Sequence, residues 1–223
     1  SGELGDIYYA EASFLRRRGI PKWGFFHMKE HNAGGPAYDL GVHFVDALMW
    51  IMGNPKPVAV SGMTYLKLGN RHEGLVESLA ESGAPLGVFS PRPYDYREFN
   101  VEDLAVGFVR FENGATMVVK VSWALNAPED INRAFVAGTR GGLQVNPPVF
   151  LTNMWGYQVT ITPKVLKDRD VFFAGHYGAT AHLLKVIRGE EKLIVQPAEV
   201  LNVMRILDGL YESAAQGREV RLG

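Results

Sequence analysis

The alternation of apolar and polar positions predicts a chain built mainly of strands, with one helix early and two helices late. β-Branched and aromatic residues alternate with polar ones in seven segments, at residues 6–16, 57–68, 102–112, 115–125, 132–139, 142–151 and 155–163. Apolar residues recur instead at helical spacing in residues 36–52, 176–189 and 197–217. A short strand at residues 219–222 is predicted to close the sheet.

This order of elements indicates the fold class. Consecutive strands joined by short turns favour antiparallel pairing, and Asn113-Gly114 between two β-rich segments is typical of a tight type I′ hairpin. The predicted fold is therefore α+β, a large and mostly antiparallel sheet with helices packed on one face. Residues 17–35 form a long Gly-rich loop, a feature that often carries function. Residues 69–100 are predicted to be a flap or an oligomer arm, with a short helix at 73–82.

Composition excludes several classes of function. The chain has 223 residues, with 23 Lys plus Arg against 24 Asp plus Glu, so a net charge of −1 predicts neither a nucleic-acid nor a membrane partner. The absence of cysteine excludes disulfides, thiolate metal sites and cysteine nucleophiles, and it fits a reducing cytoplasm. No apolar run approaches the ~20 residues that span a bilayer, and no signal peptide begins the chain. Because the sequence lacks an initiator Met, we expect a piece of a longer protein.

The helix at 36–52 carries the clearest candidate chemistry. Asp39 and His43 are spaced i and i+4, so their side chains share one helix face. A carboxylate beside an imidazole can orient it and favour its protonated form, which suits a group that takes a proton from an alcohol. Two other interpretations stay open for this pair: an ordinary surface pair, or part of a metal site. A metal site is disfavoured because no third ligand is near in the sequence.

Several residues around this helix are candidate substrate contacts. Gly34 and Gly35 precede the helix, either as a flexible lead or to let the backbone approach a substrate or a nicotinamide. The preceding loop supplies groups that a sugar would need, hydrogen-bonding side chains and an aromatic platform. These loop candidates are Arg16, Arg18, Trp23, His27, Lys29 and His31.

Other residues are weaker candidates, each with a structural alternative. Asp46 is either a partner of His43 or a solvated carboxylate, and Trp50 is assigned to the core. His176, next to Tyr177 at a helix start, is either a substrate contact or an ordinary helix-start residue. His182 is assigned to a core or an interface, and His72 carries no assignment.

The whole chain resembles the C-terminal domain of the glucose–fructose oxidoreductase, inositol dehydrogenase and MocA (Gfo/Idh/MocA) family. The resemblance rests on the pattern Gly-Gly-x-x-x-Asp-x-Gly-x-His-x-x-Asp at residues 34–46. It is supported, in the same order, by GDIYYAEASFLRR, EDLAVGFVRFENGATMVVKVSWA, VAGTRGGLQV and the closing segment IRGEEKLIVQPAEVLNVMRILDGLYESAAQGREVRL.

The resemblance implies a domain, residues 1–223, that supplies substrate contacts, catalytic residues and an oligomer interface. Its absent partner would be an N-terminal Rossmann domain that binds NAD or NADP. The implied activity is hydride transfer to or from a sugar, cyclitol or related polyol, with His43 as general acid/base and Asp39 beside it. The catalytic Lys of the family lies in the absent domain, so this chain alone would bind no cofactor.

Two alternatives to a redox domain remain. The chain could act as a stand-alone module for oligomerisation or ligand binding, forming a homodimer or homotetramer through the open face of the sheet. A cofactor-dependent glycosidase is a rarer activity on the same fold. No G-x-G-x-x-G fingerprint follows an early strand, and the nearest glycines, Gly138, Gly141 and Gly142, have the wrong spacing.

Overall fold

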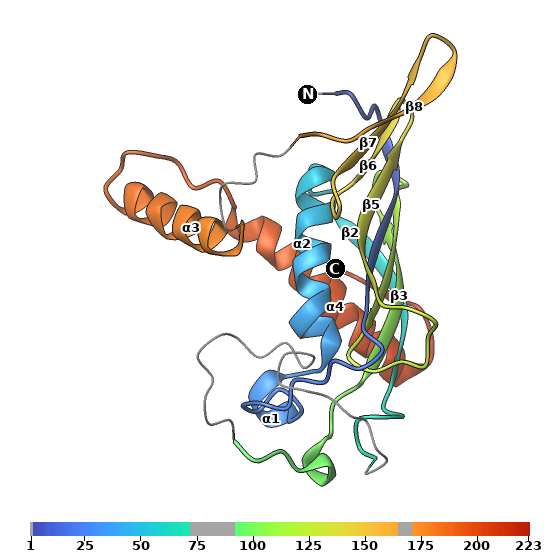
Figure 1. The fold of residues 1–223 in the computed structure, drawn as a ribbon, viewed down its shortest axis with the longest axis vertical. Coiled ribbons are helices and arrows are strands. Elements are labelled where there is room, and N and C mark those ends of the chain that lie inside the picture. Colours follow the sequence, from blue (N-terminus) through green and yellow to red (C-terminus); the bar gives the residue numbers. More distant parts are fainter. Residues whose placement is uncertain (1, 72–91, 165–170) are drawn as a thin grey trace.

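The computed structural model describes residues 2–71, 92–164 and 171–223 and shows one large sheet with helices on one side (Figure 1). The strands are β1 (Ile7–Leu15), β2 (Pro57–Tyr65), β3 (Leu104–Phe111), β4 (Thr116–Ser122), β5 (Ile131–Gly138), β6 (Gly141–Gln144), β7 (Val149–Met154), β8 (Tyr157–Ile161) and β9 (Val220–Arg221). The helices are α1 (Lys29–Asn32), the π-helical turn η1 (Ala37–Gly41), α2 (Val42–Ile51), the 3-10 turn η2 (Tyr96–Glu98), α3 (Val171–Ile187) and α4 (Pro197–Gln216). The helix predicted at 73–82 and His72 lie outside the described residues.

The predicted α+β class is confirmed. The sheet has the strand order β8-β7-β6-β5-β1-β4-β3-β2-β9, and only the β1–β4 neighbours run parallel. The antiparallel pairs arise because most strands follow one another through short turns. β1 is the exception, since it lies between two strands that come more than a hundred positions later, with Tyr9 beside Thr116 and Ile7 beside Gly138.

The core lies between the sheet and the helices α2 and α4. Alternate residues of the central strands, such as Ala10, Ala12, Val119 and Val121, point into this layer and are fully buried. Close packing of α4 on the sheet requires small residues beneath it. A Cβ on Gly107 would lie only 2.9 Å from the Leu210 side chain, and one on Gly62 would be equally close. These positions hold α4 flat against β2 and β3.

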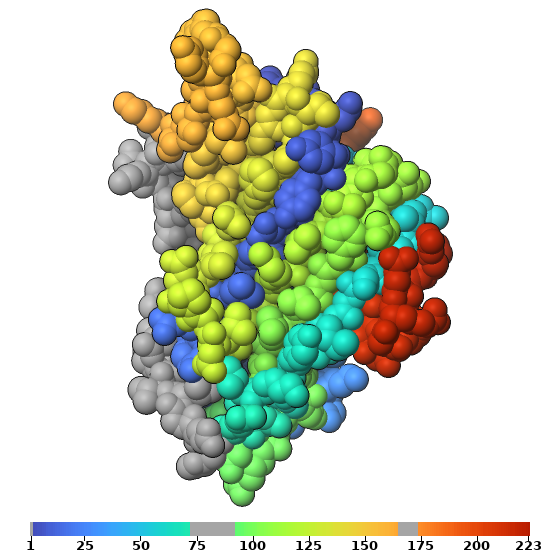
Figure 2. Space-filling model, turned by 90° about the vertical axis from the view of Figure 1, so that its right-hand side faces the viewer, coloured from blue at the N-terminus to red at the C-terminus, as the bar shows by residue number. Residues whose placement is uncertain are grey.

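The opposite face of the sheet has no helix on it (Figures 1 and 2). Its centre carries Glu11, whose carboxylate lies 3.0 Å from both the Lys120 Nζ and the Arg133 guanidinium. The Ser13 hydroxyl also donates to it, at 2.7 Å. Although burial raises the pKa of Glu11, these hydrogen bonds outweigh it and lower the pKa to about 2.

The hairpin between β3 and β4 differs from the type I′ prediction. The Gly114 N–H donates to the Phe111 carbonyl at 3.0 Å, and the Phe111 N–H donates to the Ala115 carbonyl at 3.0 Å. Gly114 alone has a positive φ, of 83°, so the loop has three residues, with a type I turn and a glycine bulge. The two-residue loop with two positive φ values occurs instead at Trp155-Gly156, between β7 and β8. The predicted strand at 142–151 is likewise split into β6 and β7.

Candidate active site

Asp39 lies in η1, at the N-terminal end of the helix that the sequence predicts as one continuous element. The structure divides this helix into a π-helical turn and the α-helix α2. π-Helical turns are rare and are frequent at functional sites. Asp39 is half-buried, and its Oδ2 accepts a hydrogen bond of 2.8 Å from the indole Nε1 of the fully buried Trp123. The indole therefore fixes one oxygen of the carboxylate.

His43 lies four residues further on, in the first turn of α2, and is exposed. The two side chains, both within the described part of the chain, form neither a hydrogen bond nor an ion pair with each other. Within the described residues, nothing is bonded to Asp39 Oδ1 or to either ring nitrogen of His43. The i, i+4 spacing thus places a carboxylate oxygen and an imidazole one helical turn apart, and both groups can hydrogen-bond to a ligand.

Arg16 lies at the end of β1, close enough to Asp39 for their charges to interact. Its guanidinium lies 5.0 Å above the Phe14 ring, and its NH1 donates to the Gly19 carbonyl at 3.4 Å. Burial lowers the pKa of the guanidinium, and the negative charges of Asp39 and Asp130 oppose that effect. An arginine stays charged in proteins, so the site has a fixed cation beside Asp39.

The other loop candidates differ in how deeply they are buried. Trp23 is half-buried, with its ring 4.6 Å from that of Phe26, and its buried indole nitrogen has no hydrogen-bond partner in the described part of the chain. Lys29 and His31 are exposed on α1, and the His31 ring lies 4.4 Å from Phe25. The structure gives no hydrogen bond between any of these three residues and Asp39 or His43.

Gly34 and Gly35 are both buried, and parts of the chain itself fill the space that a side chain would need. A Cβ on Gly34 would lie 2.1 Å from the Tyr211 hydroxyl, and one on Gly35 would lie 2.1 Å from the Glu102 carbonyl oxygen. The close approach that these glycines permit is therefore an approach to Glu102 and Tyr211. A flexible lead into the helix does not describe them.

Of the remaining candidates, His176 and Tyr177 are exposed on α3, and neither hydrogen-bonds to Asp39 or His43. His182 is half-buried, and its Nδ1 lies 2.9 Å from Glu191. Asp46 is exposed. The assignment of Trp50 to the core is wrong, because 67% of its surface is exposed.

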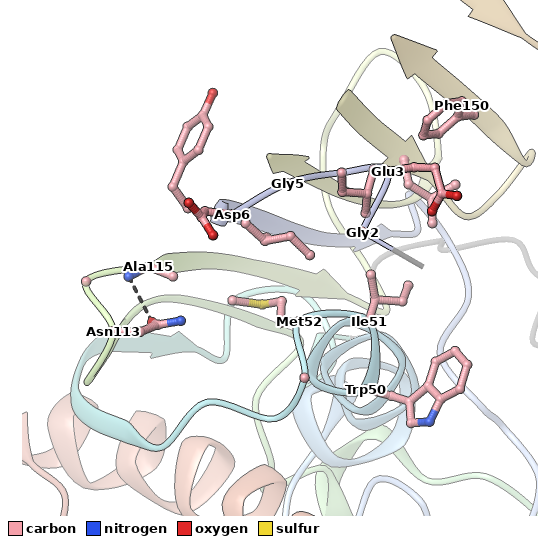
Figure 3. Close-up of a pocket in the computed structure, with 16 residues that line it drawn as sticks. Gly2, Glu3, Gly5, Asp6, Trp50, Ile51, Met52, Asn113, Ala115 and Phe150 are labelled. Atoms are coloured by element: carbon pink, nitrogen blue, oxygen red, sulfur yellow. Dashed lines mark hydrogen bonds between the residues drawn. The ribbon is translucent and has the colours of Figure 1, made fainter. Parts of the chain in front are cut away.

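A large hollow lies at the opposite end of α2 (Figure 3). It has a volume of about 1040 Å³ and lies between Trp50–Gly53 and the start of the chain at Gly2–Tyr8. Trp50 follows His43 by seven positions, or roughly 10 Å along the helix axis. This hollow is therefore separate from the candidate acid–base residues.

The described residues hold no cluster of metal ligands, and the glycines nearest to a dinucleotide-binding pattern lie in a turn between strands. No group of three or more potential metal ligands gathers in the described ranges, and none of their helices is long and apolar enough to cross a membrane. Gly138 and Gly141 lie at the β5–β6 turn, where a Cβ would meet the carbonyl oxygens of Leu4 at 2.1 Å and Leu151 at 2.7 Å. These glycines therefore serve strand packing.

Sequence reasoning missed the residues that support Asp39. Trp123 follows β4, 84 positions from Asp39, and nothing in the local pattern links the two. Glu102 is buried, and its carboxylate accepts hydrogen bonds from the Gly35 and Ala37 N–H groups and from the Tyr211 hydroxyl. The weak sequence signal for Glu102 is a charged residue directly before a strongly apolar strand.

Comparison with known proteins gives a consistent set of relatives. A family model described as the GFO/IDH/MocA C-terminal domain matches residues 1–144. D-Glucoside 3-dehydrogenase of Escherichia coli K12 is 29% identical over 223 residues, which is 100% of this chain and 58% of the relative. The chain thus spans less than two thirds of the length of this relative.

Solved structures share the fold. Levoglucosan dehydrogenase in complex with NADH superposes with a TM-score of 0.75 at 16% identity, over 100% of this chain and 60% of that one. Aldose-aldose oxidoreductase from Caulobacter crescentus, complexed with glycerol, gives a TM-score of 0.69 at 20% identity, over 99% of this chain and 57% of that one. In each case the likeness covers a little more than half of the larger protein.

Proposed function

Because this chain belongs to the GFO/IDH/MocA family, through the C-terminal domain that its residues 1–144 match, we propose that it is the catalytic and substrate domain of an NAD(P)-dependent sugar or polyol oxidoreductase. The observation that carries the proposal is the pairing of a fixed Asp39 with an exposed His43 on one helix. Because no G-x-G-x-x-G fingerprint follows an early strand, we assign cofactor binding to a nucleotide-binding domain outside this sequence.

The chemistry that this chain contributes is proton transfer. His43 takes the hydroxyl proton of the substrate as its carbinol carbon is oxidised, and it returns that proton in the reverse direction. Since Trp123 occupies Asp39 Oδ2, the role of Asp39 is to accept a substrate hydroxyl through Oδ1 and to orient that hydroxyl toward His43. Arg16 adds a fixed positive charge next to Asp39.

A polyhydroxylated substrate suits these groups, since directional acceptors and aromatic surfaces are the features that bind sugars. The names of two similar proteins support this class, because one oxidises D-glucosides and another acts on levoglucosan. Arg16 and Trp23 are half-buried, whereas Lys29 and His31 are exposed and would contact a substrate only from the outer side. We propose His176 as a secondary contact, whereas the buried Gly34 and Gly35 contribute through their close packing against Tyr211 and Glu102.

The test is His43→Ala in the protein that also carries the nucleotide-binding domain. We expect kcat to fall by at least ~100-fold, because general acid–base catalysis contributes that much or more. The affinity for the cofactor, measured by titrating the nicotinamide fluorescence, should change little, since the role proposed for His43 is on the hydroxyl of the substrate.

His182→Ala is the matched control, because it removes an imidazole of α3 that pairs with Glu191 and bonds to neither Asp39 nor His43. Its kcat should remain within a few-fold of the unsubstituted enzyme. A His43→Ala enzyme that retains wild-type kcat would remove His43 from the mechanism and with it the central element of the proposal.

A second candidate function is assembly, and the uncovered sheet face favours it. This face exposes apolar side chains, including Met63 and Tyr65 of β2, around the Glu11 cluster. We propose that two copies associate through this face to form a homodimer or half of a homotetramer. Assembly and catalysis are compatible, because the two sites lie on opposite sides of the sheet.

A further inference from the structure

We propose that Glu102 and Tyr211 are positioning residues that set the place of Asp39 and His43, an inference that rests on the proposed function. Neither residue touches Asp39 or His43 through a hydrogen bond. They act instead on the backbone of the turn that carries Asp39, and they come from two elements distant in sequence.

The Glu102 carboxylate caps the N-terminal end of the candidate catalytic helix. It is 6% exposed, and its Oε2 accepts the Gly35 N–H at 2.9 Å while its Oε1 accepts the Ala37 N–H at 3.2 Å. The first N–H groups of a helix have no acceptor within the helix, and a negative charge there is favourable. No local side chain caps η1, so a residue 65 positions from Ala37 does so.

Tyr211 ties this carboxylate to α4. Its hydroxyl donates to Glu102 Oε1 at 2.6 Å, and its ring stacks on that of Tyr38 at 5.1 Å between centroids. The Tyr38 hydroxyl in turn donates to Asp208 on the same helix. Burial raises the pKa of both phenols, so both hydroxyls remain protonated donors at neutral pH. The turn η1 is thus held to α4 at two points.

The residue after Glu102 completes the link to Asp39. The carbonyl of Asp103 accepts the Trp123 N–H at 2.9 Å, and the Trp123 indole donates to Asp39. Glu102 therefore holds the backbone just before Asp39, and Asp103 holds the residue that binds its carboxylate. Asp103 is itself buried and fixed, because its Oδ2 accepts the N–H groups of Lys67, Leu68 and Gly69.

Gly34 and Gly35 fit this interpretation. A side chain at either position would enter the space of Tyr211 or Glu102. The double glycine of the motif is therefore needed to admit the supporting network. The two glycines and Glu102 therefore all contribute to the position of η1, the turn that carries Asp39.

The direct test is amide hydrogen exchange in Glu102→Gln and Tyr211→Phe. Glutamine keeps the size of Glu102 but loses the charge and one acceptor, so the amides of residues 35–41 should exchange about tenfold faster. The amides of β3 and β4 should exchange as before. Tyr211→Phe removes a single hydroxyl, which makes it the milder variant and should give a smaller increase over the same residues.

Glu212→Gln is the matched control, because Glu212 is the exposed neighbour of Tyr211 and bonds only to Gln216. It should leave exchange unchanged at residues 35–41. An unchanged rate in Glu102→Gln would overturn the proposal. So would an equal rise across η1 and the sheet, because that result would indicate a general loss of stability.

Activity in the protein with its nucleotide-binding domain separates this inference from the proposed function. Glu102→Gln should lower kcat by about 10-fold or more through misplacement of the helix, with the KM for the cofactor unchanged. If His43→Ala has no effect on kcat but exchange at 35–41 still accelerates in Glu102→Gln, the proposed function fails and the structural support stands. If His43→Ala abolishes turnover while Glu102→Gln changes neither quantity, the positioning role fails alone.

Discussion

His27 is a buried imidazole without a hydrogen bond at either ring nitrogen among the described residues. Its Nε2 lies 3.6 Å from Glu98, and its ring lies 4.9 Å from that of Tyr94. Burial lowers the pKa of His27, although the nearby Glu98 opposes that effect. The folded protein therefore holds this imidazole in its neutral form.

Because the buried His27 is held neutral, we expect the stability of the protein to depend on pH. Between the unfolded pKa of about 6.5 and the lower folded value, the unfolded chain binds the extra proton. The free energy of unfolding should therefore fall as the pH drops below about 6.5. Replacing His27 by Phe should remove the part of this pH-dependent loss of stability that comes from His27. At pH 7 the substitution should lower the free energy of unfolding only a little, because no side-chain hydrogen bond is broken.

Urea unfolding at pH 7 and pH 5 would measure the effect. His31→Phe serves as the comparison, since His31 is exposed, and it should keep the pH dependence of the unsubstituted protein. Identical pH dependence in His27→Phe and the unsubstituted protein would show that His27 does not contribute.

Gly35 gives a second prediction at this scale. Gly35→Ala should lower the free energy of unfolding by roughly 1–3 kcal/mol, because its Cβ would press on the backbone carbonyl of Glu102. Gly175→Ala, in a helix and with no atom within 4 Å of its Cβ, should be neutral or stabilising. Thermal unfolding compares the two variants, and equal melting temperatures would contradict the crowding at Gly35.

Single residues also show how far the sequence predicts the candidate site. The spacing of Asp39 and His43 places both on one helix face, which local geometry alone can predict. The contact of Trp123 with Asp39 depends instead on β4 lying beside β1, a long-range pairing that no local pattern reveals. The same limit applies to Glu102 and Tyr211.

At the scale of elements, strands were predicted well, and in the central strands this is because one face is buried and the other is not. Alternating burial in β4 illustrates this, with Met117, Val119 and Val121 all fully buried. Turn and helix subtypes were predicted poorly. The π-helical turn and the three-residue loop at Asn113-Gly114 depend on single hydrogen bonds, whose competing forms differ by little energy.

The Glu11 cluster on β1 gives the prediction that belongs to this scale. The pKa of Glu11 lies at about 2, below its ordinary value of 4.5, so the charged form stabilises the folded state. That contribution should be complete above about pH 4.5 and should disappear as the pH falls toward 2. Glu11→Gln should therefore be less stable than the unsubstituted protein at pH 7, with the difference shrinking at pH 3.

Denaturant unfolding at the two pH values checks this expectation. The exposed Glu112, at the end of β3, provides the control substitution Glu112→Gln. A difference between Glu11→Gln and the unsubstituted protein that is the same at pH 3 as at pH 7 would contradict the charge network on the strand.

At the scale of the whole molecule, the two faces of the sheet differ sharply. One face is covered by α2 and α4 (Figure 1), and on the other the central strands lie open, with no helix of the described residues over them (Figure 2). Long sheets with one apolar, uncovered face are candidates for association. Gly62 faces α4, so its neighbour Met63, 39% exposed, points outward on the uncovered face.

Met63→Lys should therefore weaken self-association. Two-fold pairing of this face would bring the introduced charges into an apolar contact, and we expect the dissociation constant to rise by about tenfold or more. Ile187→Lys places the same charge on an exposed position of α3 and should leave association unchanged. Light scattering at tens of micromolar would measure both variants. A monomer from the unsubstituted chain would remove the basis of the assembly proposal.

The central place of β1 has a consequence for the order in which the molecule folds. β2, β3 and β4 can pair with near neighbours, and so can β5, β6, β7 and β8. β1 joins these two meanders, and its partners Thr116 and Gly138 lie more than a hundred residues away from it along the chain. Contacts of such long sequence separation form slowly. We therefore expect the two halves to form as separate nuclei and the insertion of β1 between them to be the slow step of folding.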